Sequence, residues 1–137
     1  MKSQLNRDEL EAQLHSLLGR FFVAFASVEL NLSLRVGGEG TFRDKLERLL
    51  SSLLEFTGNE DAFCQILAWY MAADSMRETR NRLAHGRWGY LVHLQRVVHV
   101  AGYPPGPQDE RRFSLGELHG IVRDVESLNN ELHGLAR

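Results

Sequence analysis

The residues of this chain that are best suited to chemistry are Arg80, Asn81 and His85, within the segment RNRLAH. Arginine stays protonated under ordinary conditions, and its planar fork can hold two phosphate oxygens at once. Histidine exchanges a proton near neutral pH, so it can act as a general base or a general acid. An asparagine amide can orient a ribose, a phosphate or the histidine ring. The combination suits a ligand that carries phosphate, and it could support RNA cleavage through the ribose 2′-hydroxyl without a metal ion.

The spacing of these residues determines how they lie on a helix. The segment closes an apolar-periodic stretch that begins near Asp61, and Gly86 follows it as a residue that can adopt positive φ and end a helix. Asn81 and His85 are four residues apart and therefore share one helical face. Arg80 and His85 are five apart, so only the length of the arginine brings the two groups together. We therefore predict a site on the last turns of a helix.

Positive charge is concentrated around the same segment. The net charge of the whole chain is only −2, which does not suit a general electrostatic binder of nucleic acid. The segment 77–87, however, carries four arginines against one acid, Glu78. The arginines beside Arg80 are expected to bind RNA or phosphate, and they are Arg77, Arg82 and Arg87. A solvated polar helix face is the alternative interpretation of this pattern.

The motif also has a purely structural interpretation. His85 would then be a cation at the negative end of the helix dipole, with Gly86 as the cap, and Arg80 would pair with an acid. Glu29 is the candidate acid, because it interrupts an apolar helical face and a half-buried carboxylate needs a partner. Arg77 or Arg80 would satisfy it, unless Glu29 lies on the polar edge of its helix.

The motif R-N-x-x-x-H resembles the signature of the HEPN superfamily (higher eukaryotes and prokaryotes nucleotide-binding domains). Two predicted helices precede the motif and one follows it, so the resemblance in architecture covers most of the chain. The resemblance implies a small helical bundle, usually dimeric, and in many members a metal-independent endoribonuclease. In HEPN toxins paired with nucleotidyltransferase antitoxins, a tyrosine two positions after the histidine is the modification target, whereas this chain has Arg87 there.

The resemblance thus implies an RNA-binding hydrolase with Arg80, Asn81 and His85 as catalytic residues, in a toxin or defence setting, that forms a 2′,3′-cyclic phosphate. One motif supplies one histidine, while the mechanism uses both an acid and a base. We therefore expect a homodimer that joins two motifs across its symmetry axis. The alternative is a non-catalytic module that binds a nucleotide or an RNA end, or that serves as the dimeric partner of a cognate protein encoded beside it.

Apolar residues at helical spacing predict two helices before the motif. The first is expected over about 7–36, after a capping box of Asn6 and Glu9. The second is expected over about 42–56, with Thr41 as its N-cap. A break at 57–59 follows it.

The third helix is expected over about 60–85, and its inward-facing residues are predicted to be Phe63, Ile66, Leu67, Tyr70 and Met71. The fourth opens at Ser114, in a second capping box with Glu117. The long apolar stripes of the first and fourth helices should form most of the core.

The stretch 87–101 is rich in β-branched and aromatic residues and has a different period. We expect two short strands in a hairpin that turns near Gln95 and Arg96, although neither residue favours positive φ. Three prolines at 104, 105 and 107 then indicate an irregular surface loop. The predicted fold of the single domain over residues 1–137 is therefore mainly α, a four-helix HEPN-like bundle with a small β-hairpin between the third and fourth helices.

The sequence indicates no cofactor and no metal site. Its six histidines lack the spacing of zinc motifs, and it contains neither a P-loop nor a dinucleotide-binding glycine pattern. His93 and His99 are expected to face each other across the hairpin, but two ligands do not make a zinc site.

Cysteine content and the N-terminus indicate a compartment. Cys64, the single cysteine, cannot form an internal disulfide and is expected to be buried, which suggests a reducing cytoplasm. The first residues lack the apolar region of a signal peptide, and the longest strongly apolar run, 21–26, is too short to span a bilayer. We therefore expect a cytoplasmic protein with no membrane partner.

Overall fold

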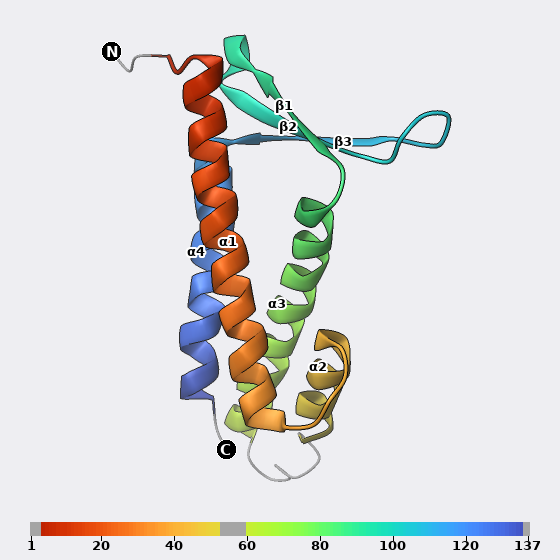
Figure 1. Cartoon of the computed structure of the whole chain (residues 1–137). Helices are drawn as coiled ribbons and strands as arrows, with labels where there is room; N and C mark the ends of the chain where they lie inside the picture. The colour runs from red at the N-terminus through yellow and green to blue at the C-terminus, as the bar shows by residue number, and fades with distance from the viewer. Residues whose placement is uncertain (1–3, 53–59, 136–137) are drawn as a thin grey trace.

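The computed structural model describes residues 4–52 and 60–135 as a helical bundle with a small antiparallel sheet at one end (Figure 1). The helices are α1 (Arg7–Val36), α2 (Phe42–Ser51), α3 (Glu60–Ala84) and α4 (Leu115–Gly134). The strands are β1 (Arg87–Leu91), β2 (Arg96–Ala101) and β3 (Asp109–Ser114), with the 3₁₀ turn η2 (Val92–Leu94) between the first two. The mainly α class is confirmed, and the sheet lies between the third and fourth helices in sequence.

Side-chain caps fix the starts of α1 and α2 as predicted. The side chain of Asn6 accepts a hydrogen bond from the amide of Glu9 at 2.9 Å, and the Glu9 carboxylate accepts one from the amide of Asn6 at 3.1 Å. Thr41 and Asp44 form the same reciprocal pair at the start of α2, at 3.1 and 2.9 Å. The end of α2 predicted at residue 56, and the break at 57–59, lie outside the described residues.

The start of α4 carries only half of the predicted capping box. The hydroxyl of Ser114 accepts a hydrogen bond from the amide of Glu117 at 3.0 Å. The Glu117 carboxylate pairs with Arg96 of β2 at 3.1 Å. Glu117 therefore ties the helix to the sheet.

Helices α1 and α4 pack along their length and form most of the core, as predicted (Figure 1). The buried residues of α1 are Leu10, Leu14, Leu17, Phe21, Phe25, Val28 and Leu32. Those of α4 are Leu118, Val122, Val125, Leu128 and Leu132. Both sets repeat every three or four residues, so each helix presents a continuous apolar stripe. By length and composition α1 is also apolar enough to cross a membrane, a test that core helices of globular domains pass as well.

The inward face of α3 differs in part from the prediction. Ile66 is buried and Leu67 and Tyr70 pack against the core, but Phe63 and Met71 are 42% and 62% exposed. The prediction of these last two as core residues is wrong.

The core positions expected for Phe63 and Met71 are taken by small residues and by a hydrogen-bonded tryptophan. Ala62 and Ala73 are buried, and Trp69 is buried with its indole N–H donating to the backbone oxygen of Leu128 at 2.8 Å. The spacing 62, 66, 69, 73 turns the buried face of α3 slightly from the predicted orientation. Cys64 is exposed for the same reason, so its predicted burial is also wrong.

The sheet has three strands in the order β1-β2-β3, all antiparallel, where a two-stranded hairpin was predicted. The β1–β2 hairpin is confirmed, and its turn places Gln95 in the left-handed region at φ 52°. The added strand, β3, pairs along the whole of β2, from Arg96 opposite Ser114 to Ala101 opposite Asp109. The proline-containing loop connects these two strands and projects from the bundle (Figure 1).

Candidate phosphate-binding site at the end of helix α3

Gly86 sets the geometry of the site because it ends α3 in a conformation that only glycine adopts freely. Its φ is +87°, and a Cβ added there would lie 2.4 Å from the backbone oxygen of Val100 and 3.0 Å from the ring of His99. The helix therefore ends at Ala84, next to the predicted boundary, and β1 begins at Arg87. His85 occupies the junction between the two elements.

Arg80 is held from two sides. Its guanidinium carbon lies 5.7 Å from the centroid of the Phe25 ring on α1, and its Nη1 donates a hydrogen bond to Oδ1 of Asn81 at 2.9 Å. Neither partner neutralises its charge. Within the described residues no carboxylate forms an ion pair with Arg80, so the pairing with Glu29 is not formed. Arg80 is thus an oriented cation that retains donors for an anion.

The other two motif residues are exposed beside it. Both the Asn81 and the His85 side chains lie at the surface, which leaves them accessible to a ligand. The backbone of His85 is restrained, because its amide donates to the backbone oxygen of Arg82 at 3.3 Å and its own oxygen accepts a hydrogen bond from Nε2 of His99. The site therefore joins accessible side chains to a fixed main chain.

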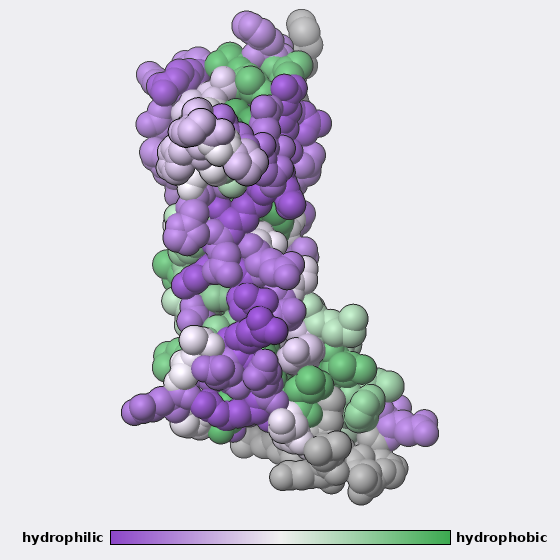
Figure 2. All heavy atoms as spheres, turned by 90° about the vertical axis from the view of Figure 1, so that its right-hand side faces the viewer, coloured by the Kyte–Doolittle hydropathy of each residue, from purple (hydrophilic) through white to green (hydrophobic). Residues whose placement is uncertain are grey.

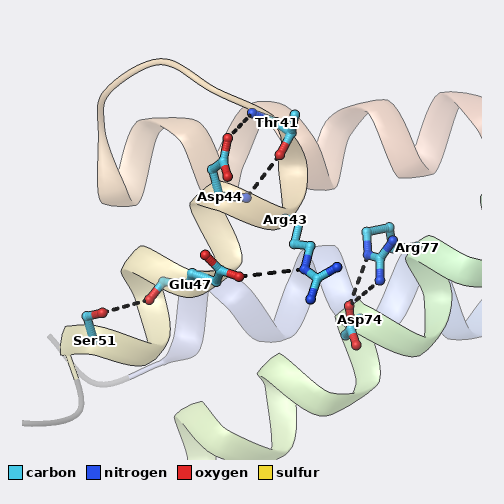
Figure 3. Close-up of polar contacts among 7 residues, drawn as sticks. All are labelled: Thr41, Arg43, Asp44, Glu47, Ser51, Asp74 and Arg77. Carbon is cyan, nitrogen blue, oxygen red and sulfur yellow. Dashed lines mark hydrogen bonds and ion pairs between the residues drawn. The ribbon is translucent and has the colours of Figure 1, made fainter.

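Arg77 lies one turn earlier and shares its charge with Asp74. Its Nε and Nη2 each approach Oδ1 of Asp74 at 2.9 Å. Figure 3 shows this pair on the side of α3 that faces α2, with Arg43 of α2 pointing toward it and itself pairing with Glu47 at 3.6 Å. Arg77 is thus a partly neutralised cation, 22% exposed, at the border of the motif. It does not pair with Glu29 either.

The remaining predicted phosphate-binding arginine on α3, Arg82, is engaged with β3. Its Nη1 forms an ion pair with the carboxylate of Asp109, and its Nη2 donates to the backbone oxygen of Asp109 at 3.2 Å. The hydrogen bond from Arg82 lowers the pKa of Asp109 below its ordinary value, so the pair stays charged. Only 13% of the Arg82 side chain is exposed.

Arg87 is engaged in the same region of the molecule. It donates to the backbone oxygen of Gly102 and to Oε1 of Gln108, both at 2.7 Å, and its guanidinium lies 4.9 Å from the Tyr103 ring centroid. Arg82 therefore binds the start of β3, and Arg87 binds the β2–β3 connection. Of the four arginines in 77–87, Arg80 alone makes neither an ion pair nor a hydrogen bond that bridges to another element, within the part of the chain that the structure describes.

The burial of His99 and its contact with His85 were not predicted from the sequence. His99 is fully buried, its ring meets that of Trp88 edge-on at 4.8 Å between centroids, and it contacts the backbone of His85. Burial lowers its pKa, and the nearby charge of Arg82 lowers it further, while the His85 carbonyl and Asp109 oppose the shift. The predicted facing of His93 and His99 is wrong, because His93 lies exposed in η2.

A signal for His99 did exist in the sequence. Val97 and His99 are two residues apart in a strand and therefore point to the same face of the sheet, which is the buried face. A polar residue in register with a buried valine indicates a hydrogen-bonded core position.

The surface around α3 is mainly polar. Seen from the side of α2 and α3, hydrophilic atoms cover most of the middle of the molecule, and apolar atoms gather at the lower right and also show at the top (Figure 2). Among the described residues no group of three or more histidine, cysteine, aspartate or glutamate side chains is placed to hold a metal ion. Comparisons of the chain with protein-family models, curated proteins and solved structures find no match.

Proposed function

We propose that this chain is a metal-independent endoribonuclease of the HEPN type, with Arg80, Asn81 and His85 as its catalytic residues. The observation that carries the proposal is the state of Arg80. Its guanidinium is oriented by the Phe25 ring and by Asn81, and it has no carboxylate partner within the described residues. Such a fork can bind two oxygens of a phosphate, and it lies on the same helix end as an exposed histidine.

In the proposed reaction His85 removes the proton from a ribose 2′-hydroxyl, and the 2′-oxygen attacks the adjacent phosphorus. The bond from phosphorus to the 5′-oxygen breaks, which leaves a 2′,3′-cyclic phosphate on one fragment. Arg80 stabilises the negative charge that accumulates on the phosphoryl oxygens in the transition state. Asn81 orients Arg80 through their hydrogen bond.

A homodimer completes this mechanism. The departing 5′-oxygen needs a proton, and a second copy of the chain would supply the second histidine from its own motif across a two-fold axis. The exposure of His85 and Asn81 is compatible with such a shared cleft. We propose a cytoplasmic toxin or defence role for the dimer, with RNA as its substrate.

The arginines around the motif would contribute unequally to RNA binding. Arg77 keeps part of its side chain exposed and would contact a phosphate next to the cleaved one. Arg82 and Arg87 would act mainly by holding the start of β3 and the β2–β3 connection, since Nη1 and Nη2 of each arginine already have partners.

Single-turnover cleavage of RNA in EDTA tests the proposal on four variants. His85→Ala should cleave roughly 10² to 10⁴ times more slowly while keeping much of its RNA affinity. Arg80→Ala should weaken phosphate contact, and Arg80→Lys should not restore it, because lysine lacks the two-pronged fork. Asn81→Ala should fall between the parent and Arg80→Ala.

Two exposed residues of α4 offer matched controls. His119→Ala and Arg123→Ala remove the same side-chain types from exposed positions outside the motif, and they should retain the parent rate and melting temperature. Cleavage by His85→Ala at the parent rate would exclude the nuclease. Unfolding of both Arg80→Ala and His85→Ala would instead assign the motif a structural role as a cap.

A second function is favoured by the engagement of Arg82 and Arg87. Because Arg82 and Arg87 are bound to other parts of the protein, only the guanidinium of Arg80 remains oriented for a ligand, which suits one terminal phosphate. The chain would then be a non-catalytic module that binds a nucleotide or an RNA end. Binding that depends on Arg80, without cleavage, would select this function.

A further inference from the structure

We propose that His99 is the positioning residue for His85, a buried imidazole on β2 that fixes the backbone of His85 and thereby the place of its side chain. The inference rests on the proposed function, in which His85 carries out proton transfer. No motif in the sequence includes His99, and it does not reach the ligand surface, because it is 0% exposed.

The contact between the two residues joins the end of α3 to the sheet. The last carbonyls of a helix have no partner within the helix and must find one elsewhere. Nε2 of His99 meets the backbone oxygen of His85, the first residue after α3. The hydrogen bond therefore restrains the main chain at the point from which the His85 side chain projects.

The His99 ring is itself held in one orientation. The Trp88 ring packs edge-on against it, and the backbone of Gly86 lies so close that an added Cβ would approach Cε1 and Nε2 at 3.0 Å. Arg111 lies opposite His99 in the register of β2 and β3. A ring enclosed in this way cannot rotate without moving the end of α3.

The chemistry of the contact defines what His99 must supply. A carbonyl oxygen only accepts, so Nε2 carries the hydrogen and donates it. The charged and titratable groups near the ring are Arg82, Asp109 and Arg111, and burial together with both arginines lowers the pKa of His99, which favours the neutral ring. Nδ1 is then an acceptor, and it has no hydrogen-bond partner among the described residues. The required property is therefore a single donor at the position of Nε2.

Two substitutions separate donation from packing. Glutamine at position 99 presents an N–H at a similar reach, whereas leucine fills the apolar space and donates nothing. If His99 positions His85, His99→Leu should lower the single-turnover cleavage rate about 100-fold, the cost of a displacement of about 1 Å, with little change in RNA affinity. His99→Gln should recover most of the rate. A packing role predicts the reverse order, because a buried amide costs more than a buried leucine.

NMR of the protein labelled with ¹³C and ¹⁵N at histidine gives a readout that does not depend on cleavage. The Cε1–H signal of His85 should shift and its mobility should increase in His99→Leu, and both should stay near the parent values in His99→Gln. In the parent at pH 7, His99 should be neutral with its hydrogen on Nε2, a measurement that needs no variant to fold.

The possible results have distinct meanings. A parent that cleaves no RNA would refute the proposed nuclease, and the His85 signals would still decide the positioning role. A His99→Leu protein with the parent's His85 signal and rate would overturn the inference while leaving the nuclease intact. A parent whose neutral His99 carries its hydrogen on Nδ1 would overturn it as well.

Discussion

Replacement of Gly86 by alanine should destabilise the protein, because two separate costs add at this position. The first is conformational, since φ is +87° and a residue with a Cβ pays roughly 1–2 kcal/mol in the left-handed region. The second is steric, since the new Cβ would lie 2.4 Å from the backbone oxygen of Val100, which belongs to a paired central strand and cannot move alone.

The steric clash of the new Cβ would also weaken the contact between His99 and His85. The Cβ would approach the His99 ring at 3.0 Å, so the ring must shift and weaken its hydrogen bond to the His85 carbonyl. A lost hydrogen bond of this kind costs about 1 kcal/mol. The sum for Gly86→Ala is therefore about 3 kcal/mol, with the conformational term responsible for no more than about 2 kcal/mol of it.

Two other glycines separate the terms. Gly37 has φ 69° and ψ 178°, a conformation essentially restricted to glycine, with nothing within 4 Å of an added Cβ, so Gly37→Ala should cost a conformational term alone, about 1–3 kcal/mol. Gly120 lies inside α4 with no neighbour within 4 Å, and Gly120→Ala should stabilise by about 0.5–1 kcal/mol. Urea unfolding followed by circular dichroism measures all three, with an unchanged m-value as the condition for comparing them. A Gly86→Ala protein within about 0.5 kcal/mol of the parent would refute the reasoning.

Three further predictions concern the core, the pH dependence and the assembly. Phe21→Ala and Leu128→Ala should each cost roughly 2–5 kcal/mol in urea unfolding, because both side chains are buried in the stripes that join α1 to α4, and parent-like stability would contradict this packing. The pKa of His99 lies below its ordinary 6.5 in the folded state, so the unfolded chain binds a proton first. Stability should be full above about pH 6.5 and fall as the pH drops below that value, with a smaller fall in His99→Gln. Light scattering at micromolar concentration should show a dimer, and a crystal structure should place the two His85 side chains in one cleft and not on opposite outer surfaces.

The helix starts could be predicted because their signals are local. A capping box needs only two side chains three residues apart, and Asn6 with Glu9 and Thr41 with Asp44 both form it. The Ser114 box was only half right, because Glu117 also lies within reach of Arg96, a partner 21 residues away. A tertiary contact with Arg96, and not the local sequence, therefore determines where the Glu117 carboxylate binds.

Strand β3 could not be predicted from its composition. It begins with Asp109, Glu110, Arg111 and Arg112, which are exposed and have low strand propensity as a group. An edge strand needs only one neighbour and can carry charges on its outer side. Its pairing with β2 and the Arg82–Asp109 ion pair hold it in place, and both are long-range contacts.

The motif was found, but the partners of its arginines were not. Sequence spacing ended the helix near Gly86, which the structure confirms, although His85 lies just after α3 and not on its last turn. The same spacing grouped Arg82 and Arg87 with Arg80 as equivalent cations. Only the fold shows that Arg82 binds the start of β3 and Arg87 the β2–β3 connection, because the partners lie 15 to 27 residues away in sequence.

The measurement that most directly tests the central claim is RNA cleavage in EDTA by the parent protein and by His85→Ala, with protein in excess over RNA. We expect the parent to produce fragments that end in a 2′,3′-cyclic phosphate, and His85→Ala to be slower by roughly 10² to 10⁴. A substrate with a single 2′-deoxy residue at the cleavage position should resist the parent. Equal rates for the two proteins, or cleavage of the deoxy-substituted substrate at the same position, would contradict a nuclease built on Arg80 and His85.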